Sequence, residues 1–219
     1  TKARMLAHEP PRFALLETML WTPDAGLPML DGHLRRLAAS ARYFGVPVDL
    51  VAVRDVLGRV TAGLAARPHK LRLVVPPDGT PQIEAVPLEP TPQGYTLGLA
   101  RESVDAADPF LYHKTTHRDV YRRALASRPA GCDDVLLWNE RGEITESTIA
   151  NVIVERDGAW LTPPLRCGLL PGVGRQQLLE QGKVTEGTIR ADELRGGSKV
   201  YLVNAVRGVW EAELSPRSD

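Results

Sequence analysis

The stretch EITESTIANVIVERDGAWLTP, residues 143–163, indicates how the second half of the chain folds. Two runs within it, IANVIVE (149–155) and AWLTP (159–163), are typical of strands. The dipeptide Asp157-Gly158 between them is a strong signal for a tight hairpin turn. This stretch therefore predicts an antiparallel pair of strands.

The segments on both sides of this hairpin extend the prediction. Upstream, DDVLLWN (133–139) is typical of a strand, and a helix is expected over about 118–126. Downstream, GLLPGVGRQQLLEQ (168–181) predicts a glycine-rich turn at the start of a helix. The run KVYLVNAVRGVWEAEL (199–214) predicts closing strands joined by a turn.

The first hundred residues predict a smaller α/β unit. FALLETMLW (13–21) is typical of a strand, and LPML (27–30) is its expected hairpin partner. Asp31 is the expected N-cap of a helix that runs from Gly32 to about Phe44. Further expected elements are a second helix over about 50–66 and strands at 70–75, 82–88 and 95–100.

Both halves combine helices with strands, so the expected fold class is α/β (α+β), with two small domains. The stretch 101–112 is polar, contains a proline and lacks helical periodicity, so we expect the connection between the domains there. The predicted division is an N-terminal α/β domain at 1–105, a linker at 106–112 and a C-terminal domain at 113–219.

The composition excludes several classes of protein. The chain has 219 residues, 43% of them hydrophobic, and its 27 basic and 27 acidic residues give no net charge. A globular protein without a basic field is expected, which argues against a nucleic-acid partner. The absence of a long apolar run predicts no membrane partner, and the start of the chain lacks a leader pattern. Two cysteines without a CxxC pair exclude a disulfide scaffold and a cysteine zinc site, so no metal is expected and a cytoplasmic location is favoured.

Three features of the second half could carry chemistry. Lys114 precedes a predicted helix and is one of only five lysines, Glu146 lies where a strand meets a turn, and the turn 170–174 precedes a helix. The free N–H groups of a helix N-terminus favour an anion such as phosphate. A lysine, a carboxylate and a phosphate cradle are the parts that a pyridoxal phosphate (PLP) site needs. Each feature also has an ordinary interpretation, as a solvated loop lysine, a surface glutamate and a plain helix start.

Five segments in this order resemble the class IV aminotransferase family, the fold type IV PLP enzymes. The resemblance covers most of the chain, and each segment is weak alone. The resemblance implies a D-amino acid aminotransferase-like fold, with the cofactor in the cleft between two α/β domains. The matching segments are HLRRL (33–37), HKTTHR (113–118), GEITESTIANV (142–152), WLTPPLRCGLLPGVGR (160–175) and YLVNAVRG (201–208).

The resemblance also implies roles for single residues. Lys114 is similar to the lysine that forms the Schiff base with the cofactor, Glu146 to the partner of the pyridine nitrogen, and Arg36 to an arginine that binds the phosphate. Many relatives have threonine where Gly174 stands, so backbone N–H groups must suffice there. Tyr121 lies further from the lysine than the tyrosine common in the family, and it is assigned no role. The remaining implied cofactor residues are Leu170, Gly172, Val173 and Gly174 in one turn and Asn204 and Ala205 in another.

Within the family, the sequences of three segments most resemble aminodeoxychorismate lyase: LLETMLW (15–21), LYHKTTHR (111–118) and NAVRG (204–208). This implies a lyase that eliminates pyruvate to give 4-aminobenzoate for folate synthesis, with Thr18 and Arg207 as candidates for binding substrate carboxylates. The alternatives are a branched-chain or D-amino acid transaminase and a non-catalytic PLP-binding subunit. The resemblance further implies a homodimer, and an association with, or descent from, an aminodeoxychorismate synthase chain.

Overall fold

The computed structural model describes residues 12–91, 93–194 and 198–216. The start of the chain, on which the prediction about a leader depends, lies outside these residues. The chain divides into two compact units: unit 1 contains residues 1–89 and 113–117, and unit 2 contains residues 90–112 and 118–219. Among the helices described, none is long and apolar enough to cross a membrane.

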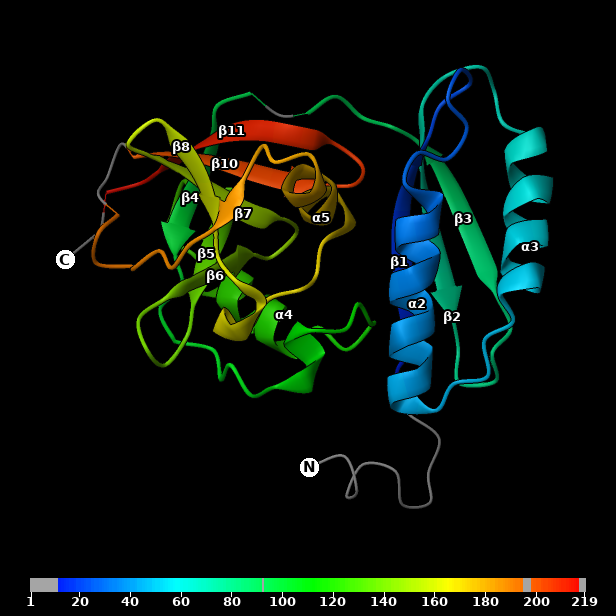
Figure 1. Cartoon of the computed structure of the whole chain (residues 1–219), viewed down its shortest axis with the longest axis horizontal. Coiled ribbons are helices and arrows are strands. Elements are labelled where there is room, and N and C mark those ends of the chain that lie inside the picture. The colour runs from blue at the N-terminus through cyan, green and yellow to red at the C-terminus, as the bar shows by residue number, and fades with distance from the viewer. Residues whose placement is uncertain (1–11, 92, 195–197, 217–219) are drawn as a thin grey trace. The chain divides into compact units, whose positions relative to one another are not determined.

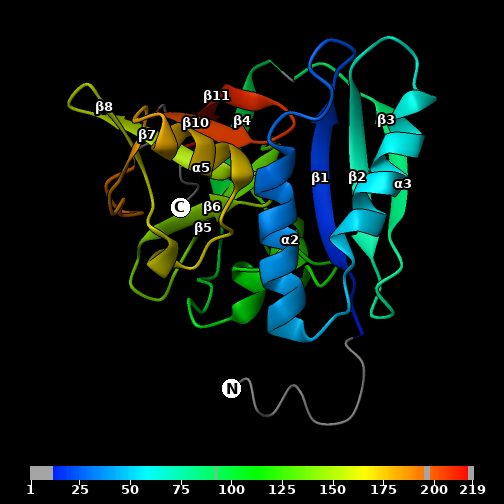
Figure 2. The same cartoon turned by 45° about the vertical axis from the view of Figure 1, so that its right-hand side comes forward.

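Unit 1 is a three-stranded antiparallel sheet with two helices (Figures 1 and 2). The middle strand buries every second residue beginning with His69 and leaves Lys70 and Arg72 exposed, which is the alternation of a sheet covered on one face. Its elements are β1 (Leu15–Trp21), α2 (Leu30–Phe44), α3 (Leu50–Ala62), β2 (His69–Val75) and β3 (Gln82–Pro87).

The predicted start of the first helix is wrong. α2 begins at Leu30, after Met29 in a left-handed conformation, and Asp31 lies inside the first turn. The segment LPML forms no strand, because β1 pairs along its whole length with β2 instead. A tight turn closed between Thr22 and Gly26 leads the chain directly into the helix. α3 has Asp49 as its N-cap and ends at Ala62, before the predicted residue 66, with Gly63 as its C-cap.

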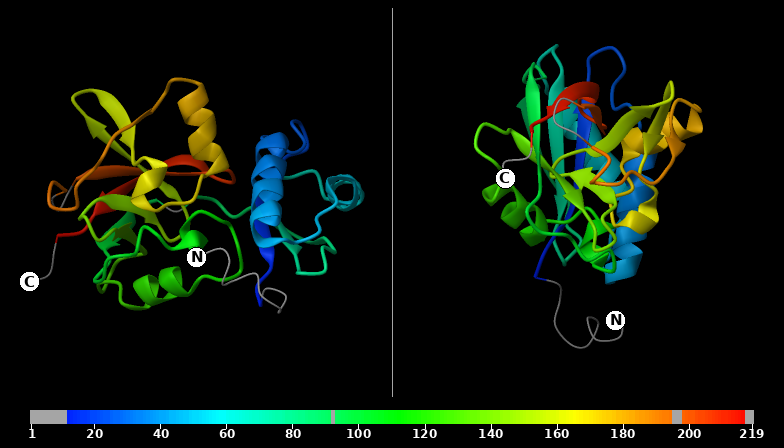
Figure 3. Two further views of the ribbon diagram at one scale, coloured as in Figure 1. Left: turned by 60° about the horizontal axis from the view of Figure 1, so that its bottom comes forward. Right: turned by 90° about the vertical axis from the view of Figure 1, so that its left-hand side faces the viewer.

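Unit 2 is built on an eight-stranded sheet of order β10-β11-β4-β5-β6-β7-β8-β9. An additional pairing between β10 and β7 joins six of these strands into a closed ring around an apolar core, and α5 packs against β10 (Figure 3). The elements are β4 (Tyr95–Leu99), η1 (Pro109–Leu111), α4 (Asp119–Ala126), β5 (Asp134–Trp138), β6 (Ile144–Ser147), β7 (Asn151–Arg156), β8 (Ala159–Thr162), η2 (Leu165–Cys167), α5 (Val173–Glu180), β9 (Thr185–Glu186), β10 (Lys199–Asn204) and β11 (Gly208–Leu214).

The hairpin predicted from Asp157-Gly158 is confirmed. β7 and β8 pair antiparallel on either side of it, and both turn residues have the positive φ that such a two-residue turn requires, 53° and 75°. The predicted glycine-rich start of α5 is also confirmed, with Gly172 as the N-cap.

The structure divides the chain differently from the predicted domains. β4, expected in the first domain, pairs in parallel with β5 and β11 in unit 2. The predicted linker at 106–112 is a packed part of unit 2, where Leu111 is buried and Ala106 N donates to Glu140. Residues 113–117, expected to open the second domain, belong to unit 1. The pattern of apolar residues identifies a strand but not the sheet it joins, which accounts for these differences.

Candidate active site

Glu146 is a buried carboxylate held by three donors of unit 2. It lies on β6, whose four residues are all buried, and is 4% exposed. Its Oε1 accepts from the Tyr121 hydroxyl at 2.7 Å and from the Leu170 N–H at 3.1 Å, and its Oε2 accepts from Asn151 Nδ2 at 3.2 Å. An ionised carboxylate accepts hydrogen bonds and donates none, so this donor set suits a charged side chain in a fixed orientation.

Asn151 connects Glu146 to the turn before α5. Its Nδ2 donates to the Leu170 carbonyl at 2.9 Å as well as to Glu146. A Cβ added at Gly172 would lie 1.8 Å from Asn151 Oδ1. The turn therefore packs directly on the asparagine that holds the buried carboxylate.

The two predicted phosphate-binding segments adjoin one another. A Cβ added at Gly174 would lie 3.0 Å from the carbonyl carbon of Asn204 and 3.2 Å from Ala205 N, so the first turn of α5 lies against that turn. The helix has no side-chain cap at Gly172, and the N–H groups of a first turn lack intrahelical acceptors. The close packing leaves little room for a side chain at Gly174.

Arg175 lies in the first turn of α5 but serves to anchor the helix. Its side chain is 2% exposed, and Nη2 donates to the Pro163 carbonyl at 2.7 Å and to Glu186 at 2.6 Å. Its Nε lies 3.3 Å from Thr162 Oγ1. These bonds tie α5 to β8 and β9, and so fix the position of its N-terminus.

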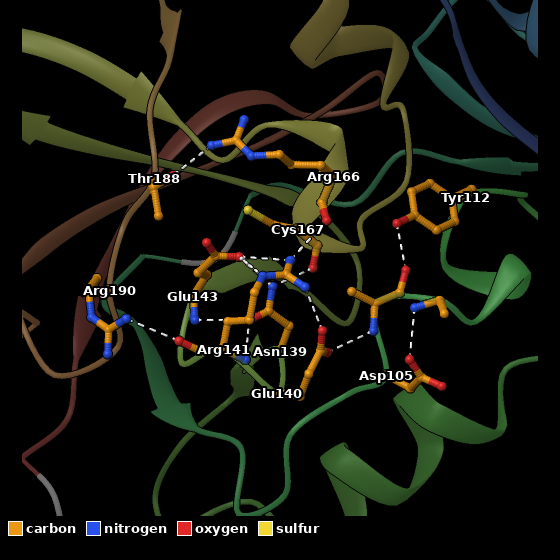
Figure 4. Close-up of polar contacts among 12 residues, drawn as sticks. Asp105, Tyr112, Asn139, Glu140, Arg141, Glu143, Arg166, Cys167, Thr188 and Arg190 are labelled. Atoms are coloured by element: carbon orange, nitrogen blue, oxygen red, sulfur yellow. Dashed lines mark hydrogen bonds and ion pairs between the residues drawn. The ribbon is translucent and has the colours of Figure 1, made fainter.

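A polar network supports the loop that leads to Leu170 (Figure 4). Asn139 Nδ2 donates to the Cys167 carbonyl at 3.0 Å and to Glu143 Oε2 at 2.8 Å. Arg141 Nη2 donates to the Arg166 carbonyl at 3.0 Å. Side chains of the turn between β5 and β6 therefore bind two backbone carbonyls of η2. These carbonyls lie a few residues before Leu170, whose N–H contacts Glu146.

We expect both cysteines to resist thiol reagents in the folded protein. Cys132 and Cys167 are buried, and burial together with the negative charge of Glu143 raises the pKa of the Cys167 thiol to about 11. Because the thiolate is the reacting species, labelling by a disulfide reagent at neutral pH should be slow until denaturant is added. Rapid native labelling of Cys167 would contradict this arrangement of the network.

Lys114 lies on a segment that unit 1 holds through its backbone. The Lys114 carbonyl accepts from Leu16 N at 2.9 Å, and Thr116 N donates to the Ala14 carbonyl at 2.9 Å, so residues 114–116 run beside the start of β1. The neighbouring His113 packs against Tyr43, with ring centroids 4.3 Å apart, and burial lowers the pKa of His113. The backbone that carries the predicted catalytic lysine is thus fixed to β1 and α2.

Arg36 forms a bidentate ion pair with Glu17, which lies in the same unit. Arg36 Nε donates to Glu17 Oε1 at 2.8 Å and Nη2 donates to Oε2 at 2.6 Å. His33 Nδ1 lies 2.7 Å from Glu17 Oε2, and because an ionised carboxylate only accepts, this ring nitrogen carries the proton. Phosphate binding by Arg36 stays a prediction; the structure shows a guanidinium oriented by a buried acid.

Sequence reasoning missed Glu17, which is 1% exposed. Burial by itself raises its pKa, but the Arg36 charge and the hydrogen bonds from Arg36 and His33 outweigh burial and lower the pKa from 4.5 to about 2. The available signal was an acid in the middle of the apolar run FALLETMLW, since a charge in such a strand is buried only when it is paired.

The two predicted substrate residues lie in different units. Thr18 is half-buried on β1, opposite Arg72 of β2. Arg207 lies in the turn between β10 and β11, where its Nη1 donates to the Pro90 carbonyl at 3.1 Å and its N–H to Asn204 Oδ1 at 2.9 Å. Their roles toward substrate stay predictions.

Comparison with known proteins identifies the class of enzyme. The sequence model of the family described as amino-transferase class IV matches residues 14–213, which include most of both units and every predicted site residue. The chain therefore belongs to this family, and solved structures of fold type IV PLP enzymes share its fold. The resemblance drawn from the five sequence segments is confirmed at this level.

Individual relatives narrow the comparison. A Schizosaccharomyces pombe protein provisionally named aminodeoxychorismate lyase is 34% identical over 210 residues, which cover 91% of this chain and 89% of that protein. The crystal structure of a provisionally named amino-acid aminotransferase from Mesorhizobium loti has a TM-score of 0.86 and 37% identity, and covers 92% of this chain and 99% of that one. The 4-amino-4-deoxychorismate lyase of Pseudomonas aeruginosa shares the fold, with a TM-score of 0.76 and 23% identity over 97% of this chain and 91% of that one.

Proposed function

We propose that this protein is a PLP-dependent 4-amino-4-deoxychorismate lyase, which eliminates pyruvate from its substrate and releases 4-aminobenzoate for folate synthesis in the cytoplasm. The choice of this reaction rests on the sequence identity with the relative named as such a lyase. That identity is 34% over 91% of this chain. The sequence match of LLETMLW, LYHKTTHR and NAVRG to lyases of this kind supports the same choice.

The residues of unit 2 fit the proposed cofactor. Glu146 is a fixed carboxylate, which would keep a proton on the pyridine nitrogen, and the backbone N–H groups at the start of α5 would receive the phosphate beside Asn204. When bound, PLP supplies an electron sink for negative charge that forms on the carbon next to the substrate amine. Arg36 would add a positive charge toward the phosphate.

Lys114 would carry out the proton transfers. Its Nζ would take the proton from the carbon that bears the amine, and would return a proton to the methylene carbon of the departing enolpyruvyl group. The bond from the ring to the enolpyruvyl oxygen breaks, the ring becomes aromatic, and the substrate atoms divide between 4-aminobenzoate and pyruvate. This reaction needs no amino-group acceptor, which distinguishes it from transamination.

The test is a product assay with purified protein, PLP and aminodeoxychorismate, without any 2-oxo acid. We expect equal amounts of 4-aminobenzoate and pyruvate. We expect Lys114→Ala to be slower by about 100- to 10,000-fold, the usual contribution of a general acid–base. Borohydride reduction followed by mass spectrometry should find the cofactor on Lys114 in the wild type and not in the variant.

The second candidate is a class IV transaminase, which the 37% identical aminotransferase structure favours. It would use the same lysine and glutamate. Transfer of amino groups from amino acids to 2-oxoglutarate, without formation of 4-aminobenzoate, would support this candidate and contradict the lyase. A wild type that retains cofactor on Lys114 but carries out neither reaction would indicate a non-catalytic PLP-binding subunit. A wild type that neither reacts nor retains cofactor on Lys114 would contradict both enzymes.

We also propose a homodimer that associates with an aminodeoxychorismate synthase chain, or descends from a fusion with one, on the strength of the resemblance. Light scattering should then give twice the monomer mass of 24.0 kDa. A monomer at micromolar concentration with full lyase activity would contradict the proposed dimer.

A further inference from the structure

Tyr121 of α4 connects a cation to the buried carboxylate. Its ring packs in a small apolar cluster with Val104, Leu111 and Leu137, and its hydroxyl donates to Glu146 Oε1 at 2.7 Å. The guanidinium carbon of Arg118 lies 4.4 Å from the centroid of the same ring. Tyr121 therefore contacts a positive side chain through the face of its ring and a negative side chain through its hydroxyl.

The hydroxyl in this arrangement is a permanent donor. Burial and the negative charge of Glu146 raise the pKa of Tyr121 well above its ordinary value, Arg118 opposes this shift, and Asp108 adds to it. The tyrosine therefore keeps its proton over the working pH range and donates it toward Glu146. Arg118 is itself held in place, because its Nη2 donates to the Thr148 carbonyl.

Tyr112, in the same unit, is a tyrosine whose hydroxyl has a structural partner only. Its hydroxyl donates to the Ala106 carbonyl at 2.7 Å, a neutral acceptor in a neighbouring loop. Tyr121 instead donates to an acid, at the oxygen that also accepts the Leu170 N–H. Hydrogen bonds to charged acceptors are shorter and stronger than those to neutral ones, so this bond contributes to the orientation of the carboxylate.

We propose that Tyr121 is a positioning residue that fixes the orientation and the charged state of Glu146, and that Arg118 stacks on its ring to hold it there. The consequence for the cofactor rests on the proposed function, in which Glu146 serves the pyridine nitrogen. The sequence alone gives Tyr121 no role in the site, because it lies further along the chain from Lys114 than the common tyrosine of the family.

The test compares Tyr121→Phe with Tyr112→Phe, since each variant removes one tyrosine hydroxyl that donates a hydrogen bond within unit 2. In the apoprotein, the carboxyl carbon of Glu146 is followed by NMR after ¹³C labelling of glutamate, and is assigned with Glu146→Gln. Losing a donor to the charged form favours protonation. We therefore expect the protonation midpoint of Glu146 to move to higher pH in Tyr121→Phe and to stay at the wild-type value in Tyr112→Phe.

Cofactor binding is the second measurement. By equilibrium dialysis, we expect PLP to bind about 10- to 100-fold more weakly to Tyr121→Phe than to Tyr112→Phe, the range for one hydrogen bond to a charged group. Arg118→Gln should change both measurements in the same direction by a smaller factor, and serves as the second variant if Tyr121→Phe is poorly folded.

The outcomes separate the two proposals. If Tyr121→Phe and Arg118→Gln match Tyr112→Phe in both the Glu146 midpoint and the affinity for PLP, the positioning role is overturned. If the wild type binds no PLP, the proposed function fails, and the Glu146 midpoint in the apoprotein alone decides the role of Tyr121. A shifted midpoint together with weaker PLP binding supports both.

Discussion

Replacing Glu17 with alanine is expected to lower the free energy of unfolding by about 3–5 kcal/mol, because it removes one partner of a buried ion pair and leaves the other uncompensated. Glu17 is 1% exposed and the Arg36 side chain is 9% exposed, so water cannot replace the lost carboxylate fully. His33 would lose its acceptor as well, and its Nε2 already lacks a hydrogen-bond partner among the residues described. Urea unfolding at neutral pH measures this loss.

The same pair predicts a dependence of stability on pH. The pKa of Glu17 is about 2 in the folded protein and near 4.5 when unperturbed, so the unfolded chain takes up the proton first as the pH falls. The contribution of Glu17 is therefore complete above about pH 4.5 and is lost between that pH and about 2. The difference in stability between wild type and Glu17→Ala should shrink over the same range.

An exposed ion pair between α2 and α3 of the same unit provides the control. Asp31 of α2 contacts Arg54 at 2.7 Å, with side chains that are 74% and 50% exposed. Asp31→Asn is expected to cost less than about 1 kcal/mol, as surface pairs do. If Glu17→Ala costs no more than Asp31→Asn, the buried pair does not stabilise unit 1 as the geometry indicates.

Replacing Gly172 with alanine is expected to cost about 2–4 kcal/mol, the range for losing two buried hydrogen bonds, and to weaken PLP binding. The backbone itself permits alanine, since φ at Gly172 is −65°. The cost arises because the new Cβ would lie 1.8 Å from Asn151 Oδ1. Asn151 would have to leave the Leu170 carbonyl and Glu146, so the loss reaches the carboxylate of the proposed site.

Two further variants test this explanation. Gly58→Ala, inside α3, has no atom within 4 Å of its new Cβ, and should stabilise the protein by up to about 1 kcal/mol through helix propensity. In an Asn151→Ala background the obstructing oxygen is gone, so Gly172→Ala should cost little there. Full additivity of the two substitutions in thermal and urea unfolding would contradict the proposed contact.

The features that could be predicted from the sequence are those set by neighbours in the chain. The hairpin at Asp157-Gly158 was predictable because few dipeptides tolerate positive φ at both positions. The start of α5 was predictable from its glycine-rich turn, and the family from five short segments in order. The same local motifs predict Lys114 and Glu146 as the catalytic pair.

The class of enzyme, most of the elements and the candidates Lys114 and Glu146 could be predicted from the sequence, because motifs and turn signals depend on residues close together in the chain. The three-dimensional fold was needed to show that β4 joins unit 2, that residues 113–117 join unit 1, and that Glu17 pairs with Arg36 and Tyr121 with Glu146. Each of these depends on partners 19 or more residues apart, and backbone propensity and apolar periodicity describe a segment without specifying its distant partner.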